Sequence, residues 1–510
     1  MQTANGGPRN VAARLEHHTD RAALILAAGE HEGEVSHADL AVRVARWRGG
    51  LAAAGVRQQH RVAVVAAPGA VLVTAHLAVV GSGAVSVVLN TDAPAAELRR
   101  ELDAAAIDAV VADEAGAALV DEALALPSPA GTDRLASGDG RAATPQRIDP
   151  AALDGSEPAP VVDVADDDPA ILLFTSGTAG PPRPAVLTHG NLGAALQSML
   201  SLPTGLLDRP QVFLGVVPMF HVLGLNAVLH LALLLGATIV LGRFPGAAET
   251  VGLIERHRVT VALGPPNLWL ALTRVPDVEP AKLASVDLAL SGASELPAMV
   301  ELAAADRLGI RLDEGYGLTE TGAVVASTVA TDAPTGSVGR LTPGVEARIV
   351  DEEGNDCLVG DPGELLVRGP MVFPGYWTPD GVDRGPLTDD GWLQTGDLAV
   401  VDDDGNLAIV GRRKDLIIVS GFNVFPAEVE AVLLDHPDVA DAGVVGEPSV
   451  STGEAVVAFV VPVGGRQIDE GELRDRCRTE LARYKVPSRI VIAPDLPVGP
   501  TGKLQRGRLR

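Results

Sequence analysis

The feature that most constrains the fold is an alternation of strand-like and helix-like segments along much of the chain. In chain order these are a helix over 36–50, a strand over 61–67, a helix over 71–80, a strand over 84–90, and a helix over 97–105 followed by the strand-like run AVVAD. Parallel strands need a crossover connection, and that connection is usually a helix. The alternation resumes at residue 170 and continues to about 330. It therefore predicts parallel sheets with helices packed on their faces.

Three other parts of the chain have different patterns. Residues 127–169 are rich in Pro, Gly, Ser, Asp and Ala without periodicity, so we expect a solvated connection. Residues 336–411 contain the short alternating segments ARIVD, GELLVRG and LAIVG between Gly- and Asp-rich turns, which predicts a small antiparallel sheet or barrel. After Lys414, strand-like segments surround a helix that should begin at Pro426, because proline is tolerated at the first helical position.

Together these patterns predict an α/β fold with two domains. The large N-terminal domain, residues 1–411, is expected to consist of αβ-layered subdomains and the small antiparallel β subdomain at 336–411. Residues 412–510 are expected to form a small α+β domain, in which Leu473 and Cys477 lie on one face of a helix. The apolar content of 47% is sufficient for large cores.

The charge of the chain limits its partners. Lys and Arg number 40 and Asp and Glu 66, so the formal net charge is −26. Nonspecific binding to nucleic acid or to an anionic membrane is therefore not expected, since both need a basic surface. From Ala482 to the end, by contrast, there are seven Lys or Arg and one acidic residue, Asp495. On so acidic a chain, this basic tail predicts contact with an anion.

Cysteine use and hydropathy bear on the location of the protein. Cys357 and Cys477 show no metal-ligand spacing and no disulfide framework, and the first residues lack the apolar core of a signal peptide, so a reducing cytoplasm is the expectation. Residues 222–241 are free of charge and as long as a membrane span. Because Asn226 and His230 interrupt them, we favour a buried helix followed by a buried strand, and no integral membrane segment.

The segment FTSGTAGPPRP, which begins at Phe174, carries the strongest chemical signal. Its glycines let backbone amides approach an anion closely, and its hydroxyls add donors. A turn of this kind between a strand and a helix is a natural phosphate cradle, although it lacks the Gly-Lys-Ser/Thr of a P-loop. Without further context, a polar strand–helix turn that binds nothing is the alternative.

This segment resembles the phosphate loop of the adenylate-forming superfamily, which includes acyl-CoA synthetases, 4-coumarate-CoA ligases, nonribosomal adenylation domains and luciferases. Other segments resemble further motifs of that family in the same order: VPMFHVLGLN at 217–226, SGASELP at 291–297, YGLTE at 316–320, GELLVRGPMVFPGYW at 363–377, WLQTGDL at 392–398, GRRKDLIIVSGFNVFPAEVE at 411–430 and PTGKLQR at 500–506. The resemblance extends from about residue 30 to the end of the chain, and so many matches in order are highly specific.

The resemblance implies a two-step reaction. A carboxylate attacks the α-phosphate of ATP to give an acyl-adenylate and pyrophosphate, and a thiol, usually coenzyme A, then displaces AMP. The implied cofactors are ATP, Mg²⁺ and coenzyme A, and the implied partner is a small-molecule carboxylic acid. The C-terminal domain is implied to be mobile and to turn about a hinge at Lys414, which would bring Ser420, Gly421 and Phe422 to the thiol.

By the same resemblance, the glycine-rich loop would hold the β- and γ-phosphates of ATP. Its residues in this role are Thr175, Ser176, Gly177, Thr178 and Gly180. The family usually has Lys-Gly where this chain has Arg183-Pro184, and a second Thr where it has Ala179. Arg183 keeps the positive charge, and its planar guanidinium can bind phosphate oxygens at two points. Pro184 removes a backbone donor from the loop.

Residues of two segments are implied to bind the rest of the nucleotide and the metal. Tyr316 would lie against the adenine, with Gly292 and Ala293 in the second adenine segment. Thr319 would lie near the α-phosphate. Glu320 would hold Mg²⁺, which proteins bind through few carboxylates plus phosphate oxygens.

Three residues near the C-terminus complete the implied site. Asp397 would accept hydrogen bonds from the ribose hydroxyls, and Arg412 would reach the ribose or a phosphate. Lys503 matches the catalytic lysine of the family, whose flexible stem carries a charge to the α-phosphate and the carboxylate.

His221 lies in the segment that resembles the wall of the acyl pocket. It is expected to orient or gate the carboxylate, with simple packing as the alternative. Residues 222–235, with the regions of Gly292 and Gly322, would line an apolar acyl or aryl pocket. No acidic residue lies between Val212 and Arg243 to pair with a substrate ammonium, which disfavours an amino acid.

The leading hypothesis is therefore an ATP-dependent carboxylic acid–CoA ligase for a fatty or aryl acid. An acyl-AMP ligase that loads the thiol of an acyl carrier protein is the close alternative, and the compact stretch at 336–411 favours coenzyme A over it. A nucleotide-binding homologue with little turnover is a third hypothesis, prompted by Arg183-Pro184. The presence of Glu320, Asp397 and Lys503 argues against it.

Overall fold

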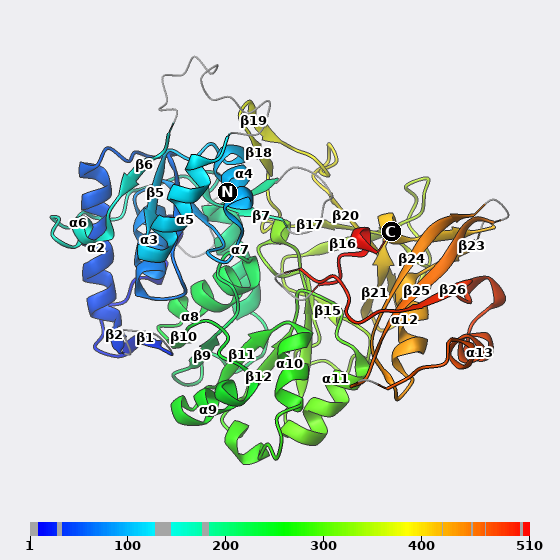
Figure 1. Cartoon of the computed structure of the whole chain (residues 1–510). Helices are drawn as coiled ribbons and strands as arrows, with labels where there is room; N and C mark the ends of the chain where they lie inside the picture. The colour runs from blue at the N-terminus through cyan, green and yellow to red at the C-terminus, as the bar shows by residue number, and fades with distance from the viewer. Residues whose placement is uncertain are drawn as a thin grey trace. The chain divides into compact units, whose positions relative to one another are not determined.

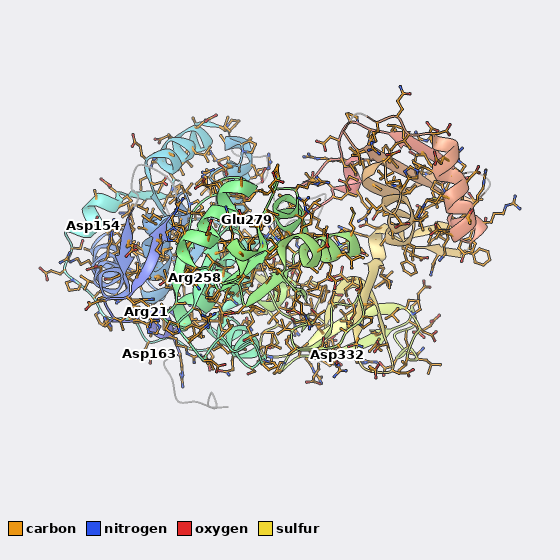
Figure 2. All side chains as sticks on the ribbon, turned by 90° about the horizontal axis from the view of Figure 1, so that it is seen from below. Arg21, Asp154, Asp163, Arg258, Glu279 and Asp332 are labelled. Carbon is orange, nitrogen blue, oxygen red and sulfur yellow. The ribbon has the colours of Figure 1, made fainter. Side chains whose placement is uncertain are left out.

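The computed structural model describes residues 9–27, 33–127, 144–175, 183–420, 422–449, 452–464, 466–499 and 503–509. The chain forms two compact units, each built from several stretches (Figure 1). The first comprises Met1–Asp332, Thr342–Val345 and Arg368–Gly391, and the second Ala333–Leu341, Glu346–Val367 and Trp392–Arg510. Figure 2 labels Asp332, where the first long stretch ends. The division of the chain into domains at residues 411 and 412 stays a prediction.

The first unit contains two large sheets, and one of them carries three of the predicted motif segments. Within the unit its strand order is β14-β13-β12-β11-β9-β10-β1-β2, with parallel pairing from β13 to β1. The strands are β1 (Ala22–Leu26), β2 (Glu34–Ser36), β9 (Val212–Gly215), β10 (Thr238–Leu241), β11 (Val261–Gly264), β12 (Leu288–Ser291), β13 (Leu312–Tyr316) and β14 (Ala326–Ser327). Helices α9 (Ala247–His257), α10 (Pro266–Thr273) and α11 (Ala298–Ala303) supply Ile254, Trp269 and Val300 to the core against this sheet. The predicted parallel sheet is confirmed.

The second large sheet of this unit has the order β19-β18-β8-β7-β4-β3-β5-β6. The strands are β3 (Arg61–Val65), β4 (Val85–Val88), β5 (Ala109–Ala112), β6 (Gln146–Ile148), β7 (Pro169–Phe174), β8 (Pro184–Thr188), β18 (Gly375–Thr378) and β19 (Gly381–Asp383). The helices predicted near residues 36, 71 and 97 are present as α2 (His37–Ala53), α3 (Ala70–Gly81) and α4 (Ala95–Ala104), and α5 (Glu114–Ala125) follows β5. Valine-rich β3 is fully buried, as a central parallel strand should be.

In the stretch at 127–169, the described residues 144–169 contain more regular structure than we expected. Strand β6 pairs in parallel with β5. The short helix α6 (Pro150–Asp154) begins at a proline, and the side chain of Asp149 caps its N-terminus. Asp154, labelled in Figure 2, accepts hydrogen bonds from Arg43 and Trp47 of α2. The prediction of a solvated connection was therefore wrong for this part, because partners distant in sequence order it.

Residues 222–241 form a buried helix followed by a buried strand, as predicted. The helix begins with a π-helical turn, η2 (Leu223–His230), and continues as α8 (Leu231–Leu234) before β10. Within the described ranges, no helix is long and apolar enough to cross a membrane. π-helical turns are rare and often occur at functional sites.

The second unit contains two smaller sheets. One has the order β16-β17-β20-β21, with antiparallel pairing of β20 to both neighbours: β16 (Glu346–Val350), β17 (Gly363–Arg368), β20 (Leu393–Val401) and β21 (Leu407–Arg412). The other contains β22 (Ile417–Val419), β23 (Phe422–Val424), β24 (Val439–Ser449), β25 (Gly453–Pro462) and β26 (Arg489–Ile492), with helices α12 (Pro426–Leu434) and α13 (Glu470–Glu480). Leu473 and Cys477 are buried on one face of α13, and Pro426 opens α12, as predicted.

The predicted β subdomain at 336–411 is not one continuous block. Strands β18 and β19 join the large sheet of the first unit, where Tyr376 of β18 lies opposite Ala185 of β8. This antiparallel pairing connects residues almost two hundred positions apart. Local patterns of alternation carry no information about such a partner.

Candidate functional site

The first unit brings three of the predicted motif segments to one edge of a sheet. Strand β9 ends at Gly215 before the segment of His221, β12 ends at Ser291, and β13 ends at Tyr316. Because β9, β11, β12 and β13 run parallel in adjacent positions, their carboxyl ends lie along the same edge. Ligands of open α/β sheets bind at the carboxyl ends of the strands. This edge is therefore the candidate nucleotide and acyl site.

The backbone after β12 is unusual. The amide of Gly292 donates to the carbonyl of Gly264 at 3.1 Å, and a Cβ at position 292 would lie 3.3 Å from the carbonyl oxygen of Gly315. Ala293 has a φ of 72°, in the left-handed region that non-glycine residues seldom adopt. The Ser291 hydroxyl is buried and has no hydrogen-bond partner among the described residues. Strained backbone of this kind clusters at ligand-binding sites.

Thr319 and Glu320 lie in a single 3₁₀ turn, η5 (Thr319–Thr321), which follows β13. Gly322 ends the turn with a φ of 65°, and Thr321 is buried. The carbonyl of Glu320 accepts a hydrogen bond from the amide of Phe373 at 2.8 Å. The Oε1 atom of Glu320 accepts a second one from the hydroxyl of Tyr376 at 2.6 Å. Two segments of the first unit that lie more than fifty residues apart are thus joined at Glu320.

The donor set around Glu320 fits Mg²⁺. Across the ranges that the structure describes, no group of three or more His, Cys, Asp or Glu side chains forms a ready-made metal cage. Mg²⁺ is commonly held by one or two carboxylates together with substrate phosphates rather than by a cage. Since Tyr376 donates to Oε1, the other carboxylate oxygen of Glu320 is the one that a cation would contact.

The glycine-rich loop has different neighbours from those expected. Strands β7 and β8, which flank it, are antiparallel, and the amide of Thr175 donates to the carbonyl of Arg183 at 3.4 Å. The expectation of a turn between a strand and a helix was wrong, because Pro184–Thr188 forms a strand before the helix α7 (His189–Leu200). Ser176, Gly177, Thr178 and Gly180 lie outside the described residues.

The THGN that follows β8 has a structural role. Thr188 and Asn191 form a capping box at the start of α7. The side-chain amide of Asn191 also donates to the carbonyls of Pro370 and Val372, at 2.9 Å each. Asn191 thereby holds the segment that leads to Tyr376.

Arg183 makes two specific contacts within the first unit. Its Nη2 donates to Oδ2 of Asp383 at 2.9 Å, and its guanidinium lies 4.1 Å from the centre of the Tyr376 ring. The sequence did not indicate Asp383 at all, and Tyr376 stood out only as part of the GYW motif. Binding of Arg183 to phosphate stays a prediction.

His221 lies beside Phe220, with the ring centres 5.4 Å apart, just before η2. Its part in binding the acid stays a prediction. Two residues of η2, however, belong to a buried chain of hydrogen-bonded polar groups that sequence reasoning missed: Ser86, His76, His230, Asn226 and Gly322. The signal in the sequence was two histidines within otherwise apolar helical segments.

The donor and acceptor roles in this series of hydrogen bonds can be assigned from the chemistry of its side chains. The Asn226 amide donates to the carbonyl of Gly322 at 2.8 Å, so its Oδ1 accepts from Nδ1–H of His230 at 2.9 Å. Burial lowers the pKa of both histidines, that of His76 to about 3, so both rings are neutral. Nε2 of neutral His230 then accepts from Nε2–H of His76, and Nδ1 of His76 accepts from the Ser86 hydroxyl.

In the second unit, β20 and β21 bring Asp397 and Arg412 together. The two residues are partners in the strand register, and Nε of Arg412 lies 2.7 Å from Oδ1 of Asp397. Asp397 is 2% exposed, and its amide donates to the Thr395 hydroxyl. This is a fixed carboxylate of the kind that can accept hydrogen bonds from a ribose, although that role stays a prediction.

Lys503 lies in the same unit as this pair. Its carbonyl accepts from the amide of Gly499, and Val498 and Leu504 pair in an antiparallel bridge. Burial, and next the positive charge of Arg412, lower the pKa of Lys503 to about 8, while the charge of Asp397 opposes that shift. The charges of Asp397 and Arg412 are thus close enough to influence Lys503.

The basic tail is anchored by acidic residues of its own domain. Nη2 of Arg506 lies 2.8 and 2.6 Å from the two carboxylate oxygens of Glu430 on α12. Lys485 pairs with Glu428, and Arg489 with Glu447. Part of the predicted anion contact is therefore internal to the protein.

The remaining predicted residues lie around η6 (Arg413–Asp415) and the strand after it. Lys414 is exposed within η6. Ser420 has a φ of 52°, and its amide donates to the carbonyl of Thr452 at 2.7 Å. Gly421 lies outside the described residues. The hinge at Lys414 and the thiol loop stay predictions.

Known proteins share both the sequence and the fold of this chain. The family model of AMP-binding enzymes matches residues 11–377, and the model of their C-terminal domain matches residues 428–503. The chain is 31% identical over 508 residues to 4-coumarate-CoA ligase 1 of Narcissus pseudonarcissus, which covers 97% of this chain and 91% of that protein. It is 34% identical over 481 residues to a feruloyl-CoA synthase of Amycolatopsis, with 93% of each chain covered.

A solved structure extends the likeness to three dimensions. ATP-bound MatB from Rhodopseudomonas palustris matches with a TM-score of 0.88 at 29% identity, over 99% of this chain and 98% of that one. The likeness therefore includes both the large sheets and the small C-terminal α+β part. From the family models, the relatives and the fold, the chain belongs to the AMP-binding enzymes, the adenylate-forming superfamily of acyl-CoA synthetases and 4-coumarate-CoA ligases, and is an AMP-forming acid–thiol ligase.

Proposed function

We propose that the protein is an ATP-dependent carboxylic acid–CoA ligase that acts on an aryl or fatty acid. The observation that carries this proposal is the gathering of the His221, Gly292 and Glu320 segments at the carboxyl edge of one parallel sheet. An apolar acyl wall, a strained adenine segment and a metal-binding carboxylate thereby share one site. Joining of an acid to coenzyme A is the activity that the names of the relatives describe.

In the first step, a carboxylate oxygen of the acid attacks the α-phosphorus of ATP. The new P–O bond forms as the bond to the β-phosphate oxygen breaks, giving acyl-AMP and pyrophosphate. We assign to Lys503 the stabilisation of the negative charge that develops on the α-phosphate, because a positioned ammonium is most effective where charge develops. Mg²⁺, held by Glu320, would supply charge neutralisation for the phosphates.

In the second step, the sulfur of coenzyme A attacks the acyl carbonyl carbon. The C–O bond to AMP breaks, and the thiol proton leaves to solvent. The left-handed Ser420 lies at the start of the loop that we assign to the thiol. Lys503 would have to leave the α-phosphate for this step, which is the role that we assign to a hinge at Lys414.

The class of acid is argued from the segment that we assign to the acyl pocket. This segment is apolar, and Leu225, Val228 and Leu229 of η2 are buried in it. No carboxylate lies between residues 212 and 243 to pair with a substrate ammonium, which disfavours an amino acid. An uncharged acyl or aryl group is therefore the best fit, consistent with the coumarate and ferulate in the names of the relatives.

One experiment tests the proposal. Purified protein with ATP, Mg²⁺ and a panel of cinnamic, benzoic and C6–C16 fatty acids should release pyrophosphate with at least one acid. Coenzyme A should then yield the acyl thioester and AMP. Transfer of the acyl group to a carrier-protein thiol but not to coenzyme A would identify the carrier protein as the acceptor. No pyrophosphate with any acid would support the homologue with little turnover.

A further inference from the structure

We propose that Arg183 and Asp383 are positioning residues for the metal-binding carboxylate, acting through Tyr376. This inference rests on the proposed function, because it takes Glu320 as the Mg²⁺ ligand. It assigns a role to the arginine that stands where the family usually has lysine, and to an aspartate outside every motif. All four residues belong to the first unit.

The sheet register brings these side chains together. Tyr376 of β18 lies opposite Ala185 of β8 on one side and opposite Asp383 of β19 on the other. Residue 183 is two positions before Ala185, so its side chain points to the same face of the sheet as that of Ala185. To reach Asp383, the guanidinium of Arg183 crosses β18 over the ring of Tyr376.

The contacts of Asp383 fix the position of the guanidinium. Oδ1 of Asp383 accepts the amide of Gly385 at 3.0 Å, and Oδ2 accepts Nη2 of Arg183 at 2.9 Å. Gly385 has a φ of 53°, and a Cβ there would lie 3.1 Å from the Tyr376 ring and 3.4 Å from Nη2 of Arg183. The turn after β19 therefore packs closely on both side chains.

The ring of Tyr376 is held from a second side. Phe373 is buried and packs edge-to-face against it, with the ring centres 4.9 Å apart. The ring thus lies between Phe373 and Arg183, with its hydroxyl aimed at Oε1 of Glu320. A hydrogen bond from a fixed phenol restricts the rotation of the carboxylate and leaves its second oxygen directed at the cation.

This arrangement makes a different prediction from direct phosphate binding by Arg183. If Arg183 bound a phosphate, its pairing with Asp383 would compete with ATP, so removal of the Asp383 charge would leave ATP affinity unchanged or raise it. If Arg183 positions Glu320, the loss of Asp383 weakens only the part of ATP affinity that depends on Mg²⁺. The two roles therefore predict different results for one substitution: a lower affinity for MgATP if Arg183 positions Glu320, and an equal or higher affinity if Arg183 binds a phosphate.

The test is calorimetric titration of the full chain with ATP, once with Mg²⁺ and once with EDTA, which needs no turnover. The Mg²⁺-dependent gain is the ratio of the affinity for ATP in Mg²⁺ to that in EDTA. Tyr376→Phe should lower this ratio about tenfold, which corresponds to the loss of one hydrogen bond to a charged group. Asp383→Asn and Arg183→Gln should lower it about two- to fivefold, as expected for a partly exposed ion pair and a cation–π contact. Affinity in EDTA should not change in any of them.

Two further variants sharpen the result. Asp287→Asn breaks an ion pair with Arg209 that is about as exposed as the Arg183–Asp383 pair, so it should leave both affinities unchanged. When Tyr376→Phe is added to Glu320→Gln, the Mg²⁺-dependent gain in ATP affinity should hardly change further, because the hydroxyl acts through that carboxylate. Full additivity of the two substitutions would overturn the proposal.

Two outcomes separate this inference from the proposed function. Wild-type protein that binds no MgATP would overturn the proposed function and this inference with it. Wild-type protein that binds MgATP, with a Mg²⁺-dependent gain that Tyr376→Phe and Asp383→Asn leave unchanged, would overturn only the positioning role. Thermal unfolding of each variant, with an unshifted midpoint, establishes that the fold is intact.

Discussion

At the scale of single residues, Lys503 should make the first half-reaction sensitive to alkaline pH. Its pKa of about 8, lowered chiefly by burial, means that the charged form is lost as the pH rises through 8. We expect kcat/KM for pyrophosphate release to fall about tenfold per pH unit above that value, since this parameter reports groups of the free enzyme. Lys503→Ala should abolish adenylation with the fold retained. Lys503→Arg stays charged, so any activity it keeps should lack this alkaline limb; an unchanged limb would assign it to another group.

Glu314 on β13 allows a stability prediction with a definite sign. It accepts the amide of Leu296 at 3.0 Å, and burial raises its pKa to about 8. A raised carboxyl pKa favours the folded state at low pH, and that advantage is lost as the pH rises from about 4.5 to 8. Glu314→Gln keeps the acceptor but cannot ionise, so it should stabilise the protein by about 3 kcal/mol at pH 7 and by almost nothing at pH 4.5. Urea unfolding at both pH values measures this, and an equal gain at the two would contradict it.

At the scale of elements, the ion pair between Glu430 and Arg506 should hold the C-terminal segment against α12. Burial raises the pKa of Glu430 while Arg506 opposes that shift, so removal of Arg506 leaves a buried carboxylate without its partner. Arg506→Gln should cost about 3–5 kcal/mol, and the double variant with Glu430→Gln distinctly less. Arg489→Gln breaks an exposed pair and should change stability by at most about 1 kcal/mol. Urea unfolding measures these changes. An equal loss of stability in Arg506→Gln and Arg489→Gln would show that the pair between Glu430 and Arg506 does not anchor the C-terminal segment.

Elements defined by local pattern were predicted well, and those defined by distant partners were not. Helices α2, α3 and α4 and the parallel strands follow from periodicity, because one apolar face or run suffices to specify each of them. Strand β18 was assigned to the wrong sheet, since its partner Ala185 is far away in sequence. The glycine-rich loop was placed between a strand and a helix because the five residues of β8 were not recognised as a strand.

The same limit applies to the candidate site. Motif order singled out Glu320, Asp397 and Lys503, whose residue types suit the chemistry that we propose for them. It gave no sign of Asp383, which acts through a register that only the folded sheet defines. The His76–His230 chain was equally hidden, because a lone histidine in an apolar helix is indistinguishable from a packed one until its partner is known.

At the scale of the whole molecule, the order of residues in the second unit bears on the motion that we propose between the two half-reactions. Lys503 follows Lys414 in the chain, whereas Asp397 and Arg412, whose charges influence it, precede Lys414. A rotation at η6 would therefore take Lys503 away from this pair without disturbing β20 or β21. A chain that could not turn there would keep the adenylation geometry and fail at the thiol step.

Lys414→Pro tests this consequence. Proline fixes φ near −65°, a value that the 3₁₀ turn η6 can adopt. It therefore permits the observed conformation but hinders the large change of backbone angles that a hinge motion needs. We expect pyrophosphate release in single turnover to stay within about threefold of wild type, while transfer of preformed acyl-AMP to coenzyme A slows by about tenfold or more. Lys414→Ala, which keeps the backbone free, should leave both steps close to wild type. If both steps slowed equally, the substitution would have impaired binding and not a hinge. A blocked hinge should slow only the thiol step, because the first step needs no change of conformation.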